Sequence, residues 1–537
     1  MAFALCAASL VLTSCADLDT EPAGSSLTES QVKSIVAQDP AKLKSQVSGL
    51  YANFIQYGTI EEWYGGLRHY DFALPAALIM GDQSGMDMVS ENTGYNWFRS
   101  QLRYTDRTLT SDCTYFLWNL YYKNIKASND VLASVDQNTT DKTALGYMGQ
   151  AYAMRAFCYL QLIQDYQFTY KGHEEAPGVP IVLETTTAEQ ASNNPRAAVK
   201  DVYAQILSDL DKAIAALDGY NRGGKEEIDQ QVAYGLRARA NLLMQNWDAA
   251  YNDAVAAAEG YQPLTIDEAA TPGFNDATAH NWIWGCVVTE DNDVVQSGIV
   301  NFPSMMSSFT GNGYSPMYAS RSINSNLWEQ IPETDVRKGW WLDTELQSPI
   351  VDPKRAETID DPKYGHYVAI YNAAGEEVVD WEIPYLNVKF GAYKNDYGNE
   401  TNACDIPLMR VEEMLLIQAE AKAMGGSISA AKEILESFIR TNRNPGYTCT
   451  ANSAEAMQDE VWMQRRIELW GEGFGLQDLL RLKKAIDRTD SNFENTVAYF
   501  LEPEAKILLW IIPEDEENYN EAIKGNNNEI VAPPTAQ

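Results

Sequence analysis

Residues 231–258 read QVAYGLRARANLLMQNWDAAYNDAVAAA, the pattern of two helices joined by a short polar turn at residues 245–247. Apolar and alanine side chains recur at helical spacing on both sides of that turn. Ala238, Ala250 and Ala257 lie 12 and then 7 residues apart. Small residues at these offsets allow two antiparallel helices to approach closely where they cross. The stretch therefore predicts a helical hairpin.

A second stretch repeats this arrangement further along the chain. Ala419 and Ala431 are again 12 residues apart, on either side of a Gly425-Gly426 turn, and Phe438 occupies the third position. These offsets are typical of tetratricopeptide helix pairs. The alternative interpretation is a set of generic helical hairpins in an alanine-rich chain.

Helical periodicity is also found outside these two units. Apolar side chains at near-helical steps predict three helices in the first half of the chain, over residues 116–134, 145–166 and 198–217. The same criterion predicts four helices in the second half, over residues 408–424, 429–441, 454–472 and 476–486. The sequence therefore predicts an all-α, tetratricopeptide-like scaffold of helical pairs.

Residues 261–405 have a different composition. Gly, Pro, Asn, Asp and Ser separate short aromatic or β-branched runs such as 281–288 and 364–372. This pattern predicts a loop-rich insertion that contains a few short strands. Trp282 and Trp284 alternate with an isoleucine on one such strand, and we expect both to belong to the core.

The composition excludes several classes of protein. The chain has 537 residues, of which 45% are hydrophobic, so it can bury a large core. Its formal net charge of −35 repels phosphate groups, which argues against nucleic acid as a partner. The same charge does not repel neutral sugars. The seven cysteines include no C-x-x-C pair, which excludes a zinc ribbon and gives no sign of a disulfide framework.

The first fifteen residues have the composition of an export signal. Residues 1–15 are almost wholly apolar or small, and they end in Leu12-Thr13-Ser14-Cys15, which resembles a bacterial lipobox. We therefore predict that Cys15 is lipidated and that residues 16–40 form a tether. The alternative is an ordinary signal peptide with an incidental cysteine.

Five segments along the chain carry a further pattern. They are CADLDTEP (15–22), MGQAYAMRAFCYLQLIQDYQ (148–167), MRVEEMLLIQAEAKA (409–423), RRIELWGEGFGLQDLLRLKK (465–484) and IIPEDEEN (511–518). In this order they resemble the SusD/RagB family, the surface lipoproteins of Bacteroidetes that help to import glycans. Gly475 and Leu476 depart from the family pattern, which often has Arg and Trp there.

The resemblance implies both an organisation and a role. It implies an N-terminal helical region at 41–230 and a C-terminal region at 231–537, with the ligand segment at 261–405. It further implies a lipid-anchored protein of the outer membrane, facing the exterior. Such a protein captures oligosaccharide or polysaccharide and delivers it to a SusC-like TonB-dependent transporter. The alternatives are a tetratricopeptide-type protein-binding adaptor and, with less support, a secreted glycoside hydrolase.

The charged residues of these segments are predicted to be structural. Arg410 and Glu413, and likewise Arg466 and Glu472, can pair across helical turns, as salt bridges within one helix or between helices. Arg465 stands three residues before a further glutamate, Glu468. We expect salt bridges from these residues.

No motif in the sequence indicates catalysis. His69, His173, His280 and His366 are far apart and none belongs to an H-E-x-x-H motif. A P-loop and a complete dinucleotide fingerprint are also missing, and Gly81 to Gly85 has its serine one place too late for a nucleophile elbow. We predict a protein without catalytic residues, cofactor or metal.

Aromatic residues in polar loops are the candidates for ligand binding. Sugar rings pack their C–H faces on flat aromatic side chains, while amides bind the hydroxyl groups. Residues 92–97 (NTGYNW) and 310–315 (TGNGYS) combine both kinds of side chain. A packed structural role is the alternative for each of these residues. The predicted ligand-binding residues are Tyr95, Asn96, Trp97, Asn312 and Tyr314.

Overall fold

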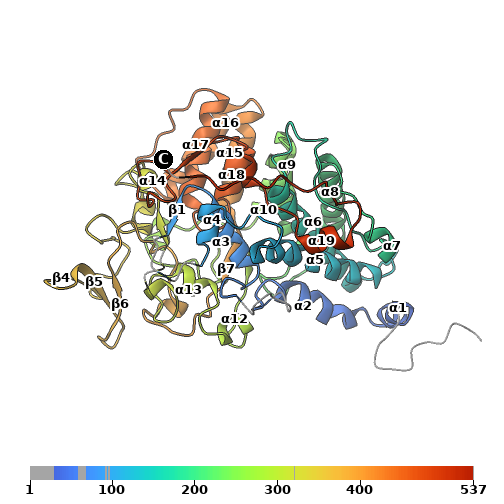
Figure 1. The fold of residues 1–537 in the computed structure, drawn as a ribbon, viewed down its shortest axis with the longest axis horizontal. Helices are drawn as coiled ribbons and strands as arrows, with labels where there is room; N and C mark the ends of the chain where they lie inside the picture. Colours follow the sequence, from blue (N-terminus) through green and yellow to red (C-terminus); the bar gives the residue numbers. More distant parts are fainter. Residues whose placement is uncertain are drawn as a thin grey trace, which may run out of the picture.

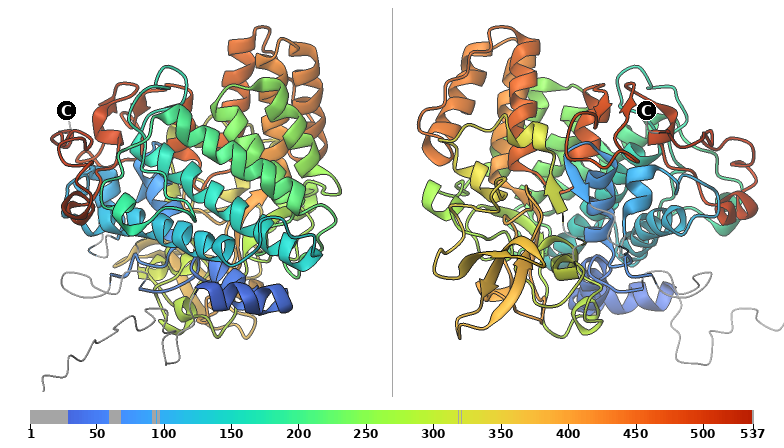
Figure 2. Two further views of the ribbon diagram at one scale, coloured as in Figure 1. Left: turned by 90° about the vertical axis from the view of Figure 1, so that its right-hand side faces the viewer. Right: turned by 60° about the vertical axis from the view of Figure 1, so that its left-hand side comes forward.

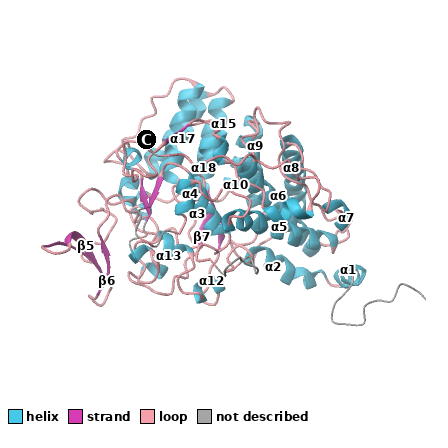
Figure 3. Ribbon diagram, viewed as in Figure 1, coloured by secondary structure: helices cyan, strands magenta, loops and turns pink. Residues whose placement is uncertain are grey.

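The computed structural model describes residues 29–58, 68–90, 94, 97–317, 319 and 321–535. The predicted signal segment, Cys15 and residues 16–28 of the predicted tether lie outside the described residues, as do Tyr95 and Asn96. Helices form most of the scaffold, and the strands are short (Figures 1 and 3). The predicted all-α scaffold with a strand-containing insertion is confirmed.

The first part of the described chain contains short helices and one strand. These elements are α1 (Glu29–Gln38), η1 (Pro40–Leu43), α2 (Lys44–Ala52), α3 (Leu74–Ser84), β1 (Met88–Ser90) and α4 (Arg99–Arg103). Longer helices follow, namely α5 (Asp112–Ala133), α6 (Lys142–Tyr166), α7 (Ala188–Ala191) and α8 (Val199–Ala216). They confirm the three helices predicted from periodicity in this half. α6 is buried on nearly all sides, which explains its apolar character around the whole helix.

The two predicted helical hairpins are confirmed. They are α9 (Gln230–Leu243) with α10 (Trp247–Ala258), and α15 (Val411–Met424) with α16 (Ile428–Asn442). The five alanines that predicted these crossings are completely buried: Ala238, Ala250, Ala257, Ala419 and Ala431. α10 packs against both α9 and α15, so the helical pairs continue across the insertion, as Figure 2 shows. The chain closes with α17 (Ala454–Glu468), α18 (Gly475–Arg481), η5 (Lys506–Leu508) and α19 (Glu514–Tyr519).

Three predicted helix boundaries are wrong. The helix predicted from residue 408 begins at Val411, because residues 406–410 form a strand. The helix predicted to reach residue 472 ends at Glu468, and the one predicted to reach residue 486 ends at Arg481.

The insertion between α10 and α15 consists of short helices, strands and loops. Its helices are α11 (Ile266–Ala269), α12 (Asp293–Gln296), α13 (Phe302–Met306), η2 (Ser315–Met317), α14 (Ser325–Trp328), η3 (Val336–Trp340) and η4 (Tyr393–Asn395). Its strands are β2 (Trp282–Cys286), β3 (Arg321–Ile323), β4 (Ala356–Asp361), β5 (Gly365–Tyr371), β6 (Glu377–Trp381) and β7 (Ile406–Arg410). The strands pair antiparallel in the sheets β1-β3, β2-β7 and β4-β5-β6. A further small antiparallel sheet consists of β8 (Ile486–Asp487) and β9 (Phe500–Leu501). An isolated bridge between Gly273 and Phe390 is parallel.

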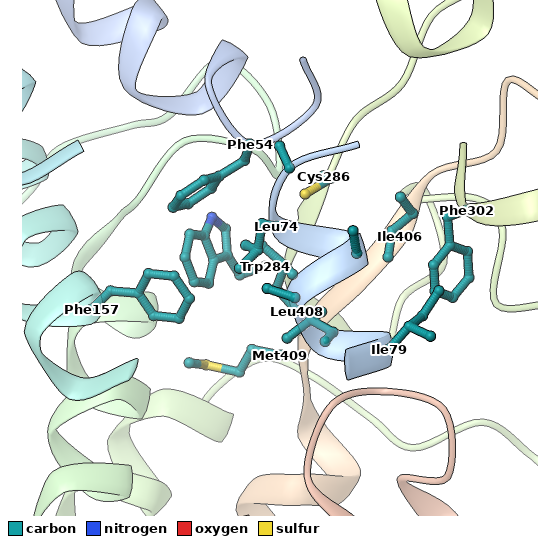
Figure 4. Close-up of a cluster of buried hydrophobic side chains, with 14 of the residues drawn as sticks. Phe54, Leu74, Ile79, Phe157, Trp284, Cys286, Phe302, Ile406, Leu408 and Met409 are labelled. Atoms are coloured by element: carbon teal, nitrogen blue, oxygen red, sulfur yellow. The ribbon is translucent and has the colours of Figure 1, made fainter. Parts of the chain in front are cut away.

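Trp284 joins the insertion to the helical scaffold. Its ring lies between Phe54, which follows α2, and Phe157 of α6, with ring centroids 6.4 and 5.1 Å away (Figure 4). Its indole N–H donates to the carbonyl oxygen of Glu226 at 2.9 Å. Trp282 and Trp284 are each 1% exposed, which confirms their assignment to the core.

A buried network of charges joins β7 to the helices that follow it. The guanidinium of Arg410 binds Glu472 through two hydrogen bonds of 2.8 Å and Glu468 at 3.1 Å. Arg443 binds Glu468 through two further bonds of 2.8 Å, and Lys389 binds Glu472 at 2.7 Å. All five side chains are buried. The network therefore connects four separate segments of the chain.

The structural role predicted for the motif charges is confirmed, but their partners are different. Glu413 binds Arg239 at 2.7 Å and does not bind Arg410. Arg466 binds Asp87 at 2.6 Å, and Arg465 binds Asp478 at the same distance.

Within the described ranges, no helix combines the length and the apolar composition that a membrane crossing requires.

Candidate functional site

Two of the predicted ligand-binding residues, Trp97 and Tyr314, lie against each other. Their ring centroids are 6.3 Å apart at an interplanar angle of 72°. His69 completes a triangle, with its ring 5.3 Å from that of Trp97 and 6.0 Å from that of Tyr314. Its Nδ1 forms a hydrogen bond with the Tyr314 hydroxyl. Tyr70 packs edge-on against Trp97 at 5.9 Å, and we call these four residues the aromatic cluster.

The four rings of the aromatic cluster differ in exposure. Tyr314 is 4% exposed and Tyr70 is 8% exposed, whereas Trp97 and His69 are only partly buried. Burial raises the pKa of the Tyr70 hydroxyl, so this group stays protonated. The cluster therefore exposes parts of the Trp97 and His69 rings, and these pack against the buried rings of Tyr70 and Tyr314.

One buried arginine holds the backbone on both sides of the cluster. Arg321, the first residue of β3, donates to the carbonyl oxygen of Trp97 at 3.1 Å and to that of Ala319 at 2.5 Å. Its burial lowers the pKa of the guanidinium to about 10, so it remains charged at neutral pH. Phe98, directly after Trp97, has a left-handed backbone with φ of 72°. Backbone strain of this kind is commonly found at functional sites.

The loop that carries Tyr314 is fixed against α13. The Tyr314 N–H donates to the carbonyl oxygen of Ser304 at 3.0 Å and to its Oγ at 3.1 Å. Gly313 has a φ of 147°, and a Cβ atom there would lie 2.5 to 2.7 Å from atoms of Ser304. Only glycine permits this approach, and the position of Tyr314 depends on it.

The structure places Asn312 in contacts between loops. Its side-chain amide donates to the carbonyl oxygen of Glu400 at 3.2 Å. Its backbone carbonyl oxygen accepts hydrogen bonds from the Asn402 side-chain amide at 2.6 Å and from the Thr310 hydroxyl at 3.1 Å. Of the five predicted ligand-binding residues, the structure thus describes three and brings two of them, Trp97 and Tyr314, into the cluster.

Charged groups lie next to the cluster. Arg68, which precedes His69, donates through Nε to Asp112 at 2.6 Å, and both side chains are partly exposed. This hydrogen bond to a carboxylate raises the pKa of Arg68. A partly exposed indole and imidazole beside a guanidinium and a carboxylate suit a ligand with one apolar face and hydroxyl groups at its edge.

The described residues give no sign of a metal centre. No group of three or more His, Cys, Asp and Glu side chains there is arranged to hold a metal ion.

Sequence reasoning missed His69 and Arg321. His69 was considered only as a metal ligand, although residues 63–70 (WYGGLRHY) have the same mixture of glycine, aromatic and polar residues as residues 92–97. That composition could have indicated it. Arg321 lies in no such stretch, because its role depends on contacts that form only in the folded chain.

Comparisons with known proteins agree with this fold. A family model described as "Starch-binding associating with outer membrane" matches residues 77–242, and one described as "SusD family" matches residues 303–528. SusD-like protein P38 of Formosa agariphila is 23% identical over 407 residues, which are 71% of this chain and 74% of that protein.

Solved structures are similar over nearly the whole chain. A SusD-like carbohydrate binding protein from Bacteroides vulgatus has a TM-score of 0.70 at 23% identity, and the match covers 91% of this chain and 98% of that one. A SusD superfamily protein from Bacteroides thetaiotaomicron has a TM-score of 0.69 at 21% identity. The match covers 91% of this chain and 99% of that chain. At these identities the structural likeness shows the fold.

Proposed function

We propose, because this chain belongs to the SusD family, that it binds carbohydrate at the outer membrane and captures an oligosaccharide at the aromatic cluster. The observation that carries this assignment is the meeting of Trp97, His69 and Tyr314, from three separate segments, in one partly exposed group. The description of the matching family model and the name of the Bacteroides vulgatus neighbour support the ligand class.

The chemistry of the cluster fits a sugar ring. The exposed parts of Trp97 and His69 can pack against its C–H face. Tyr314 engages Nδ1 of His69, and Nε2 has no partner among the described residues, so this nitrogen can bind a hydroxyl group. The ion pair of Arg68 and Asp112 offers further donors and acceptors at the rim. In this proposal the chain binds its ligand without changing it chemically.

The proposed partner is a SusC-like TonB-dependent transporter. The membership in the SusD family supports this role, since one matching family model is described as associating with the outer membrane. A lipid anchor at Cys15 would keep the protein next to its partner on the membrane surface. The predicted tether of residues 16–40, in which Glu29–Gln38 form the helix α1, would then raise the effective concentration of one protein near the other.

Replacing Trp97 by alanine should weaken binding of the glycan. Stacking on an aromatic side chain contributes about 1–3 kcal/mol where it has been measured for bases, and we expect a loss of that order here. The measurement is retardation on affinity gels that contain a panel of polysaccharides, followed by titration with the best ligand. Trp247→Ala removes a partly buried tryptophan at the start of α10 and serves as the matched control.

Thermal unfolding separates the two roles open to Trp97. A variant with normal stability and weakened binding supports the proposal. A variant with lowered Tm and unchanged affinity would show that Trp97 only packs, and the binding site would have to be sought elsewhere.

Extraction in a mild detergent, followed by a pull-down on this protein, should recover a large β-barrel transporter. Recovery of the protein alone, under conditions that preserve other outer-membrane complexes, would contradict the delivery role. Recovery of a different protein partner, together with no binding to any polysaccharide, would favour the tetratricopeptide-type adaptor.

A further inference from the structure

The sheet of β4, β5 and β6 stands out from the rest of the protein (Figures 1 and 3). One face of this sheet carries two tyrosines together with apolar and acidic side chains. We call it the tyrosine face and define it by Glu357, Ile359, Asp361, Tyr367, Tyr371, Glu377 and Asp380.

The strand register places these residues on one side. Ile359 is the cross-strand partner of Tyr367, and Tyr371 is the partner of Glu377. Tyr371 also donates its hydroxyl hydrogen to Glu357 at 3.1 Å, a diagonal contact that requires both side chains to be on the same face.

The opposite face attaches the sheet to the protein. Val368, Ile370 and Trp381 are buried there, each at most 3% exposed. The ring of Trp381 packs edge-on against Phe309 at 5.4 Å, and its indole N–H donates to the carbonyl oxygen of Ser308 at 3.0 Å. The sheet is therefore firmly anchored, while Tyr367 and Tyr371 remain partly exposed and Glu357 and Glu377 exposed.

The tyrosine face is strongly acidic. The strand register places Glu357, Asp361, Glu377 and Asp380 on this face around Tyr367. Burial and then these negative charges raise the pKa of the Tyr367 hydroxyl. Glu357 and Glu377 form no ion pair within the described part of the chain. A field of this sign opposes the approach of sulfate, phosphate or uronate groups.

We propose that the tyrosine face is a second carbohydrate contact, which holds an extended and uncharged polysaccharide along β5. The proposal rests on the carbohydrate-binding function inferred above. Tyr367 and Tyr371 are four residues apart on one strand, a separation of about 13 Å. A single sugar ring is too small to reach both, whereas successive units of a polymer can pack on one ring each. The carboxylates then accept hydrogen bonds from the sugar hydroxyl groups.

Two contacts on one polymer strengthen each other. Once a chain is held at one contact, its binding at the second is governed by a high effective concentration. A short oligosaccharide that occupies only the aromatic cluster lacks this gain. The affinity for a short ligand therefore measures the aromatic cluster alone, whereas the affinity for a long ligand of the same composition measures both contacts together.

The test uses the double variant Tyr367→Ala/Tyr371→Ala in the full chain. On affinity gels that contain a neutral polysaccharide, its apparent affinity should be about tenfold lower than that of the wild type. Its affinity for a short oligosaccharide of the same polymer, measured by titration, should stay unchanged. The double variant Tyr367→Phe/Tyr371→Phe keeps the rings and should behave as the wild type.

Tyr364→Ala is the matched control on the same hairpin. Tyr364 is 64% exposed at the turn between β4 and β5, and the ammonium of Lys363 lies 4.4 Å from the centre of its ring. This variant should keep full retardation by the polysaccharide. Thermal unfolding of all variants shows whether a loss comes from misfolding.

A charged ligand provides the second arm of the test. A carboxymethylated form of the same polysaccharide should bind the wild type less well than the neutral form. Glu357→Gln/Glu377→Gln should reduce that difference.

Each remaining outcome bears on one proposal or on both. Full polymer binding by the alanine double variant, together with loss of binding in Trp97→Ala, would overturn the second contact and leave the first intact. Equal wild-type binding of the neutral and carboxymethylated polymers would also contradict the second contact as stated. No binding of the wild type to any polysaccharide would overturn both.

Discussion

Replacing Glu468 by glutamine is expected to lower the free energy of unfolding by about 3–5 kcal/mol, the largest stability loss that we predict. Glu468 is fully buried at the end of α17 and accepts two hydrogen bonds of 2.8 Å from Arg443. It also accepts bonds from Arg410 at 3.1 Å and from Arg337 at 3.3 Å. Glutamine keeps the shape but removes the charge, so three buried guanidinium groups lose a shared counter-charge. Urea unfolding measures the effect.

Glu436→Gln is the control for this change. Glu436 pairs with the well exposed Arg440 one turn further along α16. Its Oε1 also accepts a hydrogen bond from the Cys449 N–H, which a glutamine oxygen can keep. Exposed pairs at this spacing contribute about 0.3–0.5 kcal/mol, so the control should be nearly neutral. If Glu468→Gln were no more destabilising than Glu436→Gln, the buried network would not stabilise the fold in the way described.

The same carboxylate predicts how stability depends on pH. Burial alone raises the pKa of Glu468, but the charges of Arg443, Arg410 and Arg337 outweigh it and hold the pKa well below its usual range. A carboxyl whose pKa is lowered by folding contributes its stability above its unfolded pKa of about 4.3. That contribution is lost as the pH falls towards the lower, folded value. The wild type should therefore lose stability below about pH 4.3 more steeply than Glu468→Gln.

The structure shows why the charge partners could not be predicted from spacing. A pair of Arg410 and Glu413 within one helix, one of the two predicted arrangements, requires both residues to belong to that helix. Arg410 instead ends β7 with an extended backbone, and α15 begins one residue later. Its side chain consequently points to Glu468 and Glu472, which are distant in sequence. By contrast, small side chains are required wherever two helices pack closely. The spacing of the alanines therefore predicted the helical pairs correctly.

The aromatic cluster was predictable only in part, for a related reason. Loop composition indicated Trp97 and Tyr314, but it contains no information on which loops lie next to each other in the folded chain. The two residues meet because Arg321 binds the backbone of Trp97 and because Gly313 lets its loop pack on Ser304. Asn312, selected by the same composition, is held through its side-chain amide and its backbone carbonyl by a loop from residues 399–402 that periodicity could not place.

Replacing Cys15 by alanine is expected to move the protein from the membrane fraction to the soluble fraction. Cys15 lies outside the described residues, and its lipidation is a prediction from the Leu12–Cys15 ending. Acyl chains contribute about 0.8 kcal/mol per buried CH₂ group, so losing them changes the partition by orders of magnitude. The measurement is immunoblotting of fractionated cells, and Cys6→Ala, in the same apolar segment, should stay with the membrane. The released Cys15→Ala protein should bind glycan normally, because the aromatic cluster lies in the folded body, but it should no longer support uptake through a transporter. Retention of Cys15→Ala in the membrane fraction would contradict the lipid anchor.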